Sequence, residues 1–160
     1  MKPMVVDANQ RSLPLEREEF HEIFPFLTAD ESEIFCSYLE VQEWPVDGVL
    51  MKDGDTGEFM GFLIDGRLAV KKETSFPGKQ TLVAILERGS MVGEIAVVEP
   101  SPRNATVVAA EKSTLLILTR EGLDRLLEEN HKLGIKLLKR IIHVLGSRLR
   151  KASDRLALLL

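Results

Sequence analysis

The chain has 160 residues, of which 44% are hydrophobic and 29% charged, and its formal net charge is −4 at pH 7. A chain of this length and composition buries an ordinary core as one domain, and its single cysteine excludes an internal disulfide. Its apolar stretches are short and no signal-peptide core follows the first residues, so we expect a cytoplasmic protein with no membrane association.

Residues 1–40 are predicted to form an N-terminal helical segment. Helix formers dominate residues 15–20. Thr28, with Glu31 three residues later, forms the capping-box pattern that begins a helix. Cys36 falls in this second helix without an activating partner nearby, so we expect a buried structural thiol rather than a nucleophile.

Residues 41–119 are predicted to form a compact β-structure of short strands. Gly, Pro or Asp separates six β-rich runs, at 49–51, 59–64, 68–72, 81–86, 105–110 and 113–118. Asp65-Gly66 lies between two of them and is typical of a two-residue hairpin turn. Many short strands separated by turn residues favour a sandwich or roll.

Residues 93–106 form a motif suited to a sugar that carries one phosphate. A short helix that begins near Glu94 would direct unpaired backbone N–H groups at the anion, and Gly93 would let the backbone approach it closely. An ionised Glu94 accepts a hydrogen bond from a sugar hydroxyl, whereas the flat guanidinium of Arg103 suits two phosphate oxygens. Pro102 presets the turn that delivers Arg103.

Residues 120–160 are predicted to be helical, with Thr119 as a plausible cap. The last helix carries apolar residues at alternating steps of three and four, the seam of a coiled coil: Ile135, Leu138, Ile142, Leu145, Leu149, Ala152, Leu156 and Leu159. Leu137, Ile141 and Val144 are expected to pack on the chain's own β-structure instead. Because residues 131–160 span roughly 45 Å as a helix, the distal half needs a partner.

The motif resembles, without insertion or deletion, the phosphate-binding cassette of the cyclic nucleotide-binding domain. Residues 54–66 resemble a second stretch of that family, which begins with Gly-Asp and ends with Gly. Gly61 stands where the family usually has an aromatic residue, and Val92 stands where it usually has Phe. Both departures concern packing rather than the contacts to the anion.

The resemblance implies a mainly β fold with flanking helices: an eight-stranded jelly-roll barrel with N-terminal helices and a long C-terminal dimerisation helix, all in one domain. It also implies that the backbone N–H groups of Ala96 and Asn104 meet the phosphate. The implied cassette residues are Gly93, Glu94, Ile95, Ala96, Arg103, Asn104, Ala105 and Thr106. Related transcription factors place a Thr-Ser pair on the last helix against the purine, which makes Ser153 a candidate base contact from either subunit.

Charge is uneven along the chain. Residues 131–160 hold eight basic residues and one acidic residue, whereas residues 1–130 hold thirteen basic and twenty-four acidic residues. A basic helix suits nucleic acid or an acidic partner, but such charges more often form the solvated face of a coiled coil, which is the interpretation we favour. Related transcription factors continue into a helix-turn-helix domain beyond this point, so we expect a stand-alone form without sequence-specific DNA binding.

These features favour a binding function over catalysis. His21, His131 and His143 lack metal-ligand spacing, so neither an enzyme nor a metal site is expected. We expect a cyclic mononucleotide-binding regulatory homodimer, with cyclic AMP as the favoured ligand and cyclic GMP as the alternative, that signals to an unknown effector protein by helix rearrangement. The other hypothesis is a dimeric protein-interaction module that binds no nucleotide or a different small anion, with Arg103 paired to an acid such as Glu99.

Overall fold

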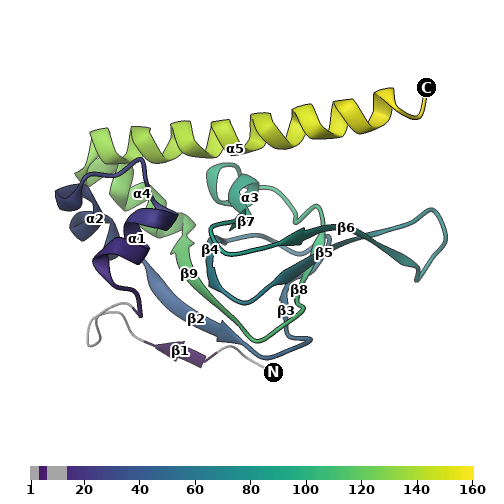
Figure 1. The fold of residues 1–160 in the computed structure, drawn as a ribbon, viewed down its shortest axis with the longest axis horizontal. Helices are drawn as coiled ribbons and strands as arrows, with labels where there is room; N and C mark the ends of the chain where they lie inside the picture. Colours follow the sequence, from purple (N-terminus) through teal and green to yellow (C-terminus); the bar gives the residue numbers. More distant parts are fainter. Residues whose placement is uncertain (1–3, 7–13) are drawn as a thin grey trace.

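The chain folds into two antiparallel sheets flanked by helices (Figure 1) in a computed structural model that describes residues 4–6 and 14–160. The five-stranded sheet contains, in spatial order, β1 (Met4–Val6), β2 (Glu40–Trp44), β9 (Ser113–Thr119), β4 (Phe59–Asp65) and β7 (Met91–Val92). The four-stranded sheet contains β3 (Val49–Met51), β8 (Thr106–Ala109), β5 (Leu68–Glu73) and β6 (Gln80–Leu86). The mainly β fold with flanking helices is thus confirmed.

The expected eight-stranded barrel is wrong in its details. The described residues contain nine strands, and the two sheets do not close into a barrel. Three strands match none of the predicted β-rich runs: β1, which lies in the segment expected to be helical, its partner β2, and β7, which has two residues. So short a strand carries no alternation of apolar and polar residues, and its pairing with β4 is a long-range contact.

The N-terminal helices are α1 (Arg17–Ile23) and α2 (Ala29–Cys36), which follow β1 in the chain. The predicted capping box is confirmed, because Thr28 Oγ1 accepts from the Glu31 backbone N–H at 3.2 Å and Glu31 accepts from the Thr28 N–H at 2.9 Å. Phe24, the C-cap of α1, and Phe35 of α2 both pack onto β4: their ring centroids lie 4.8 and 6.0 Å from that of Phe62.

Packing explains the glycine that replaces an aromatic residue in β4. A Cβ on Gly61 would lie 2.6 Å from Leu115 Cδ2, closer than real Cβ atoms come to their neighbours. Val92 is buried opposite Gly61 in the same sheet. The space that an aromatic ring would take is therefore filled by the leucine and the valine.

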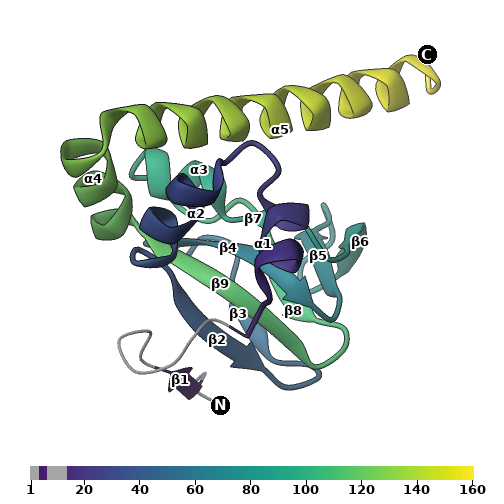
Figure 2. The same ribbon diagram turned by 60° about the vertical axis from the view of Figure 1, so that its left-hand side comes forward.

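The C-terminal part consists of α4 (Arg120–Glu129) and α5 (His131–Ala157), which meet at the non-helical Asn130. Thr119 caps α4, as predicted, by accepting from the Gly122 N–H at 2.9 Å. The first turns of α5 are buried against the core through Leu133, Leu137 and Ile141, whereas every residue from 149 to 160 is exposed. Figures 1 and 2 show that α5 passes over α3 (Glu94–Val98) and that its C-terminal end extends past the other helices.

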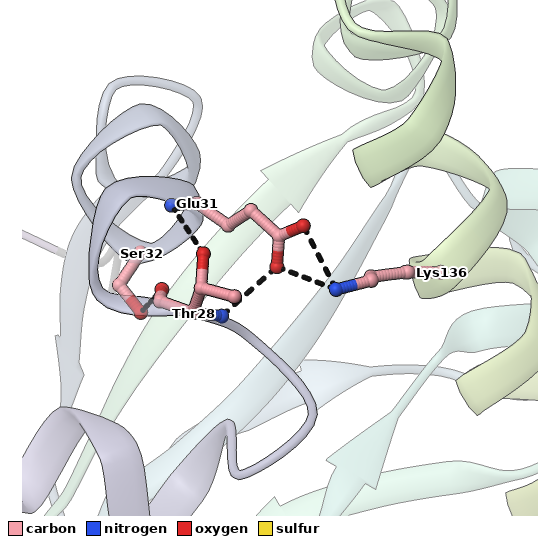
Figure 3. A network of polar contacts seen from close by, with 4 residues as sticks. All are labelled: Thr28, Glu31, Ser32 and Lys136. Carbon is pink, nitrogen blue, oxygen red and sulfur yellow. Dashed lines mark hydrogen bonds and ion pairs between the residues drawn. The ribbon is translucent and has the colours of Figure 1, made fainter.

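Polar contacts attach α2 to the C-terminal helices. Lys136 Nζ of α5 lies 2.8 Å from both carboxylate oxygens of Glu31, the residue that closes the capping box of α2 (Figure 3). Tyr38 donates to Glu129 and accepts from Asn130 at the junction of α4 and α5. Across residues 4–6 and 14–160, no helix combines the length and hydropathy needed to cross a bilayer.

Candidate functional site

The cassette begins with a glycine whose backbone no other residue adopts easily. Gly93 has φ 75° and ψ 15°, in the left-handed region, directly before α3. A Cβ there would lie 2.5 Å from Met51 Cε and 2.6 Å from Arg103 Nη1. The glycine therefore allows both the turn into α3 and the close approach of the Arg103 guanidinium.

Arg103 is a buried cation, with a side chain in contact with carbonyl oxygens rather than with acids. It is 6% exposed; Nη2 donates to the Phe59 carbonyl at 2.7 Å and Nη1 to the Gly93 carbonyl at 3.2 Å. The Phe59 ring lies 4.8 Å from Arg103 Cζ in a cation–π contact. Among the described residues Arg103 forms no ion pair, so the structure does not contain the alternative pairing with Glu99.

Burial is the main reason that the pKa of Arg103 is lowered; Glu94 raises it and the positive charge of Arg120 lowers it. An arginine stays charged after such a shift, because its ordinary pKa is so high. The guanidinium retains N–H groups beyond the two that bind carbonyls. A buried cation with spare donors attracts an anion strongly.

The segment 52–58 (defined here as the β3–β4 loop) holds the cassette in place. The Arg103 N–H donates to the Asp55 carbonyl at 2.8 Å, and the Gly54 N–H donates to the Arg103 carbonyl at the same distance. Thr106 accepts from the Asp53 N–H at 3.0 Å. The two stretches that resemble the family, 54–66 and 93–106, are therefore in direct contact.

Glu94 is the buried acid of the site. It is 4% exposed, and its Oε1 lies 2.5 Å from Arg148 Nη1 of α5. Arg148 also donates to the Met91 carbonyl. The other carboxylate oxygen, Glu94 Oε2, is buried and has no hydrogen-bond partner among the described residues. One oxygen of Glu94 is therefore attached to α5, and the other is available to a donor.

The remaining predicted residues differ in their placement. Ala96 and Thr106 are buried beside Arg103 and the β3–β4 loop, whereas Ile95 and Asn104 are exposed and Ala105 is half-buried. Ser153 lies in the exposed end of α5, five residues after Arg148. A single chain therefore does not bring Ser153 into the cluster around Glu94 and Arg103.

Sequence reasoning missed Arg148 and Arg120. Arg120 Nη2 donates to the Gly57 carbonyl at 2.5 Å and to the Ala96 carbonyl at 2.6 Å. The excess of basic residues after position 130 pointed to the helix that carries Arg148, but no local pattern distinguished this arginine from its neighbours.

Other reactive groups stand apart from this site. Burial raises the pKa of the Cys36 thiol to about 11, so it is protonated at neutral pH and a poor nucleophile. In the part of the chain that the structure describes, no three His, Cys, Asp or Glu side chains are grouped to hold a metal ion.

Comparison with known proteins finds proteins that are similar to this chain in sequence and in fold. The family model described as "Cyclic nucleotide-binding domain" matches residues 41–130. The chain is 32% identical over 113 residues to a cAMP-dependent protein kinase regulatory subunit of Pyricularia oryzae, covering 69% of this chain and 28% of that protein. It is 31% identical over 104 residues to a cGMP-dependent protein kinase of Eimeria tenella, covering 65% and 10%.

Solved structures agree with the sequence matches. A cyclic nucleotide-binding domain from Methylobacillus flagellatus has a TM-score of 0.80 at 28% identity, with 87% of this chain and 83% of that chain covered. The catabolite activator protein of Thermus thermophilus has a TM-score of 0.73 at 27% identity, with 86% and 62% covered. The chain spans at most 45% of the length of its first curated relatives.

Proposed function

Because this chain belongs to the cyclic nucleotide-binding domain family, we propose that it binds a cyclic mononucleotide, with cyclic AMP as the favoured ligand and cyclic GMP as the alternative. One observation carries the proposal: a buried guanidinium with spare donors and a buried carboxylate oxygen that has no partner among residues 4–6 and 14–160 belong to one cassette. A cyclic nucleotide offers the matching groups, a phosphate anion and a ribose 2′-hydroxyl donor.

The proposed roles follow from these groups. Arg103 binds the phosphate oxygens, together with the backbone N–H groups of Ala96 and Asn104. Glu94 Oε2 accepts from the 2′-hydroxyl, which would satisfy a buried oxygen to which no described residue donates a hydrogen bond. Gly93, which has no side chain, lets the Arg103 guanidinium lie close to the start of α3.

We propose that the C-terminal helices report occupancy. Glu94 carries both the free oxygen assigned to ribose and the oxygen that binds Arg148 of α5. A ligand that changes the position or charge distribution of this carboxylate therefore changes the free energy of the α5 contact. Only the part of the binding free energy that differs between the helix arrangements can shift their populations.

We further propose a homodimer through α5. Four apolar side chains spaced by seven residues are half-exposed or more on this helix: Ile135, Ile142, Leu149 and Leu156. Leu138 and Leu145, which the predicted seam also included, instead pack partly against the chain's own core. In such a dimer Ser153 of either subunit would be the candidate base contact.

We propose that the protein signals to an effector protein. We further propose that it catalyses no reaction and that this chain alone does not bind specific DNA sequences. The basic side chains of α5 then serve as the solvated face of the paired helices. A single half-buried free cysteine suits the reducing environment of the cytoplasm, where we place the protein.

The test is calorimetric titration of cyclic AMP and cyclic GMP into protein that was unfolded and refolded to remove bound nucleotide. Arg103→Ala should weaken binding by roughly 1.5–3 kcal/mol, the usual contribution of a hydrogen bond to a charged group. The affinity of Arg103→Lys should lie between those of the parent and of Arg103→Ala, because lysine keeps the charge but not the planar pair of donors. Arg67→Ala, which removes an exposed arginine paired with Glu87 and Glu111, is the matched control.

No heat with either nucleotide, in protein whose circular dichroism shows that it is folded, would reject this function and favour the interaction module. Equal affinity of Arg103→Ala and the parent would reject the site. The ratio of the two affinities in Asn104→Ala tests the purine preference, since Asn104 follows the phosphate-binding arginine and can donate as well as accept.

A further inference from the structure

Arg120 is the first residue of α4, a position where a positive charge is unfavourable. The N-terminus of a helix carries the positive end of its dipole, so acids rather than bases stabilise the first turn. The side chain instead reaches away from its own helix, and Nη2 donates to the carbonyls of Gly57 and Ala96 at 2.5 and 2.6 Å. Its backbone N–H donates to the Glu58 carbonyl at 2.8 Å. These contacts, not the helix, explain an arginine here.

The two carbonyls belong to the two parts that surround Arg103. Ala96 lies in α3, and its own N–H is a proposed phosphate donor. Gly57 lies in the β3–β4 loop, and a Cβ on it would overlap Ala96 Cβ and lie 2.9 Å from Arg103 Cζ. Since the loop, α3 and Arg103 pack without a gap at this point, a shift of one displaces the others.

The positive charge of Arg120 also couples it to Arg103. Arg120 and Arg103 repel each other, and this repulsion contributes to the lowered pKa of Arg103. Arg120 Nε is buried without a hydrogen-bond partner among the described residues. An anion bound at Arg103 would offset the repulsion and so favour the position of Arg120 against the two carbonyls.

We propose that Arg120 is a positioning residue that joins α3 and the β3–β4 loop to the start of α4, so that these elements move as one unit. Arg120 acts through the Ala96 peptide and does not itself touch the ligand. That these contacts of Arg120 transmit nucleotide binding to α4 and α5 rests on the proposed function. The contacts themselves are present in the ligand-free protein and can be tested there.

The first measurement is amide hydrogen exchange of the ligand-free protein. Arg120→Gln should raise exchange in both α3 and the first turns of α4 by roughly tenfold, the effect of losing a charge-assisted hydrogen bond of about 1.4 kcal/mol. Arg120→Lys should rescue part of the protection, because an ammonium group can still donate to a carbonyl. Arg125→Gln is the control, since Arg125 lies in the same helix but contacts the Tyr38 ring.

The second measurement repeats the exchange at saturating cyclic AMP. In the parent, protection should increase in α3 and change in α4. In Arg120→Gln, α3 should still respond while α4 no longer does, a separation that a general loss of stability would not produce. A parent that does not bind cyclic AMP would reject the proposed function but leave the ligand-free result to decide on Arg120.

Three outcomes would overturn the proposal. The first is parent-like exchange of α3 and α4 in ligand-free Arg120→Gln. The second is an α4 response to cyclic AMP that persists in Arg120→Gln. The third is an α4 response that Arg125→Gln abolishes to the same extent as Arg120→Gln. Arg120→Lys keeps the proposal testable if the neutral variant does not fold.

Discussion

Glu94 Oε1 and Arg148 Nη1 lie 2.5 Å apart although the two residues are 54 positions apart in the sequence. The carboxylate is buried at the start of α3, and the guanidinium projects from α5 and is partly exposed. The acid proposed to receive the ribose therefore also holds the long C-terminal helix. The cassette and the C-terminal helix therefore share one carboxylate.

Arg148→Ala should lower the free energy of unfolding by about 1–3 kcal/mol, because Glu94 would stay buried without its ionic partner. Urea denaturation measures this. Arg150→Ala removes an exposed arginine from the same helix and should change stability by no more than about 0.5 kcal/mol. If the two variants lost the same stability, the ion pair would contribute nothing specific. Adding Glu94→Gln to Arg148→Ala should restore part of the loss.

Gly57→Ala should destabilise the protein and weaken nucleotide binding together. The new methyl group would overlap Ala96 Cβ and crowd the Arg103 guanidinium, and both of these residues are buried. Gly146→Ala is the matched control in α5, because among the described residues its Cβ would meet only Arg150 Nη1, at 3.4 Å. This substitution should stabilise the helix by roughly 1 kcal/mol. Thermal unfolding and titration of cyclic AMP test both, and a neutral Gly57→Ala would contradict the close packing.

The ion pair between Glu31 and Lys136 should make stability depend on pH. The hydrogen bond from Lys136 is the main reason that the pKa of Glu31 is lowered. A lowered folded-state pKa contributes stability that is present above the unfolded-state pKa and is lost as the pH falls through the folded-state value. Because the pair is partly exposed, we expect a contribution of only about 0.5 kcal/mol.

The check is the free energy of unfolding of Lys136→Met and the parent, measured from about pH 6 to about pH 3. The difference between the two should shrink as the pH falls. Lys139→Met removes an exposed lysine of the same helix and should show no such trend. A constant difference across the range would mean that Lys136 does not lower the pKa of Glu31.

Leu149→Asp and Leu156→Asp should each turn a dimer into a monomer in light scattering. Both side chains are more than 60% exposed in the single chain, so the substitutions should leave its fold intact while burying a charge in the paired helices. Lys151→Asp introduces the same residue at another exposed position of α5 and should leave the dimer in place. A dimer that persists in both leucine variants would have its interface elsewhere.

Local sequence determined the features that depend on neighbouring residues. Thr28 and Thr119 cap helices, and Gly66 has φ 92° in the predicted hairpin turn. Six of the strands lie where β-rich runs predicted them. The cassette also follows from sequence, because its glycine, acid and arginine fall within one short segment whose residue types match a phosphate and a sugar.

Tertiary structure alone decided which distant groups complete this cassette. Arg148 and Arg120 reach Glu94 and Ala96 from helices that follow in the chain, and no spacing rule relates residues separated by β8 and β9, strands of two different sheets. The same reason explains Gly61, whose missing side chain reflects Leu115 in the neighbouring strand. Burial then sets the chemistry, because a cation or a carboxylate oxygen is left without an acid or donor only after the fold has removed water from around it.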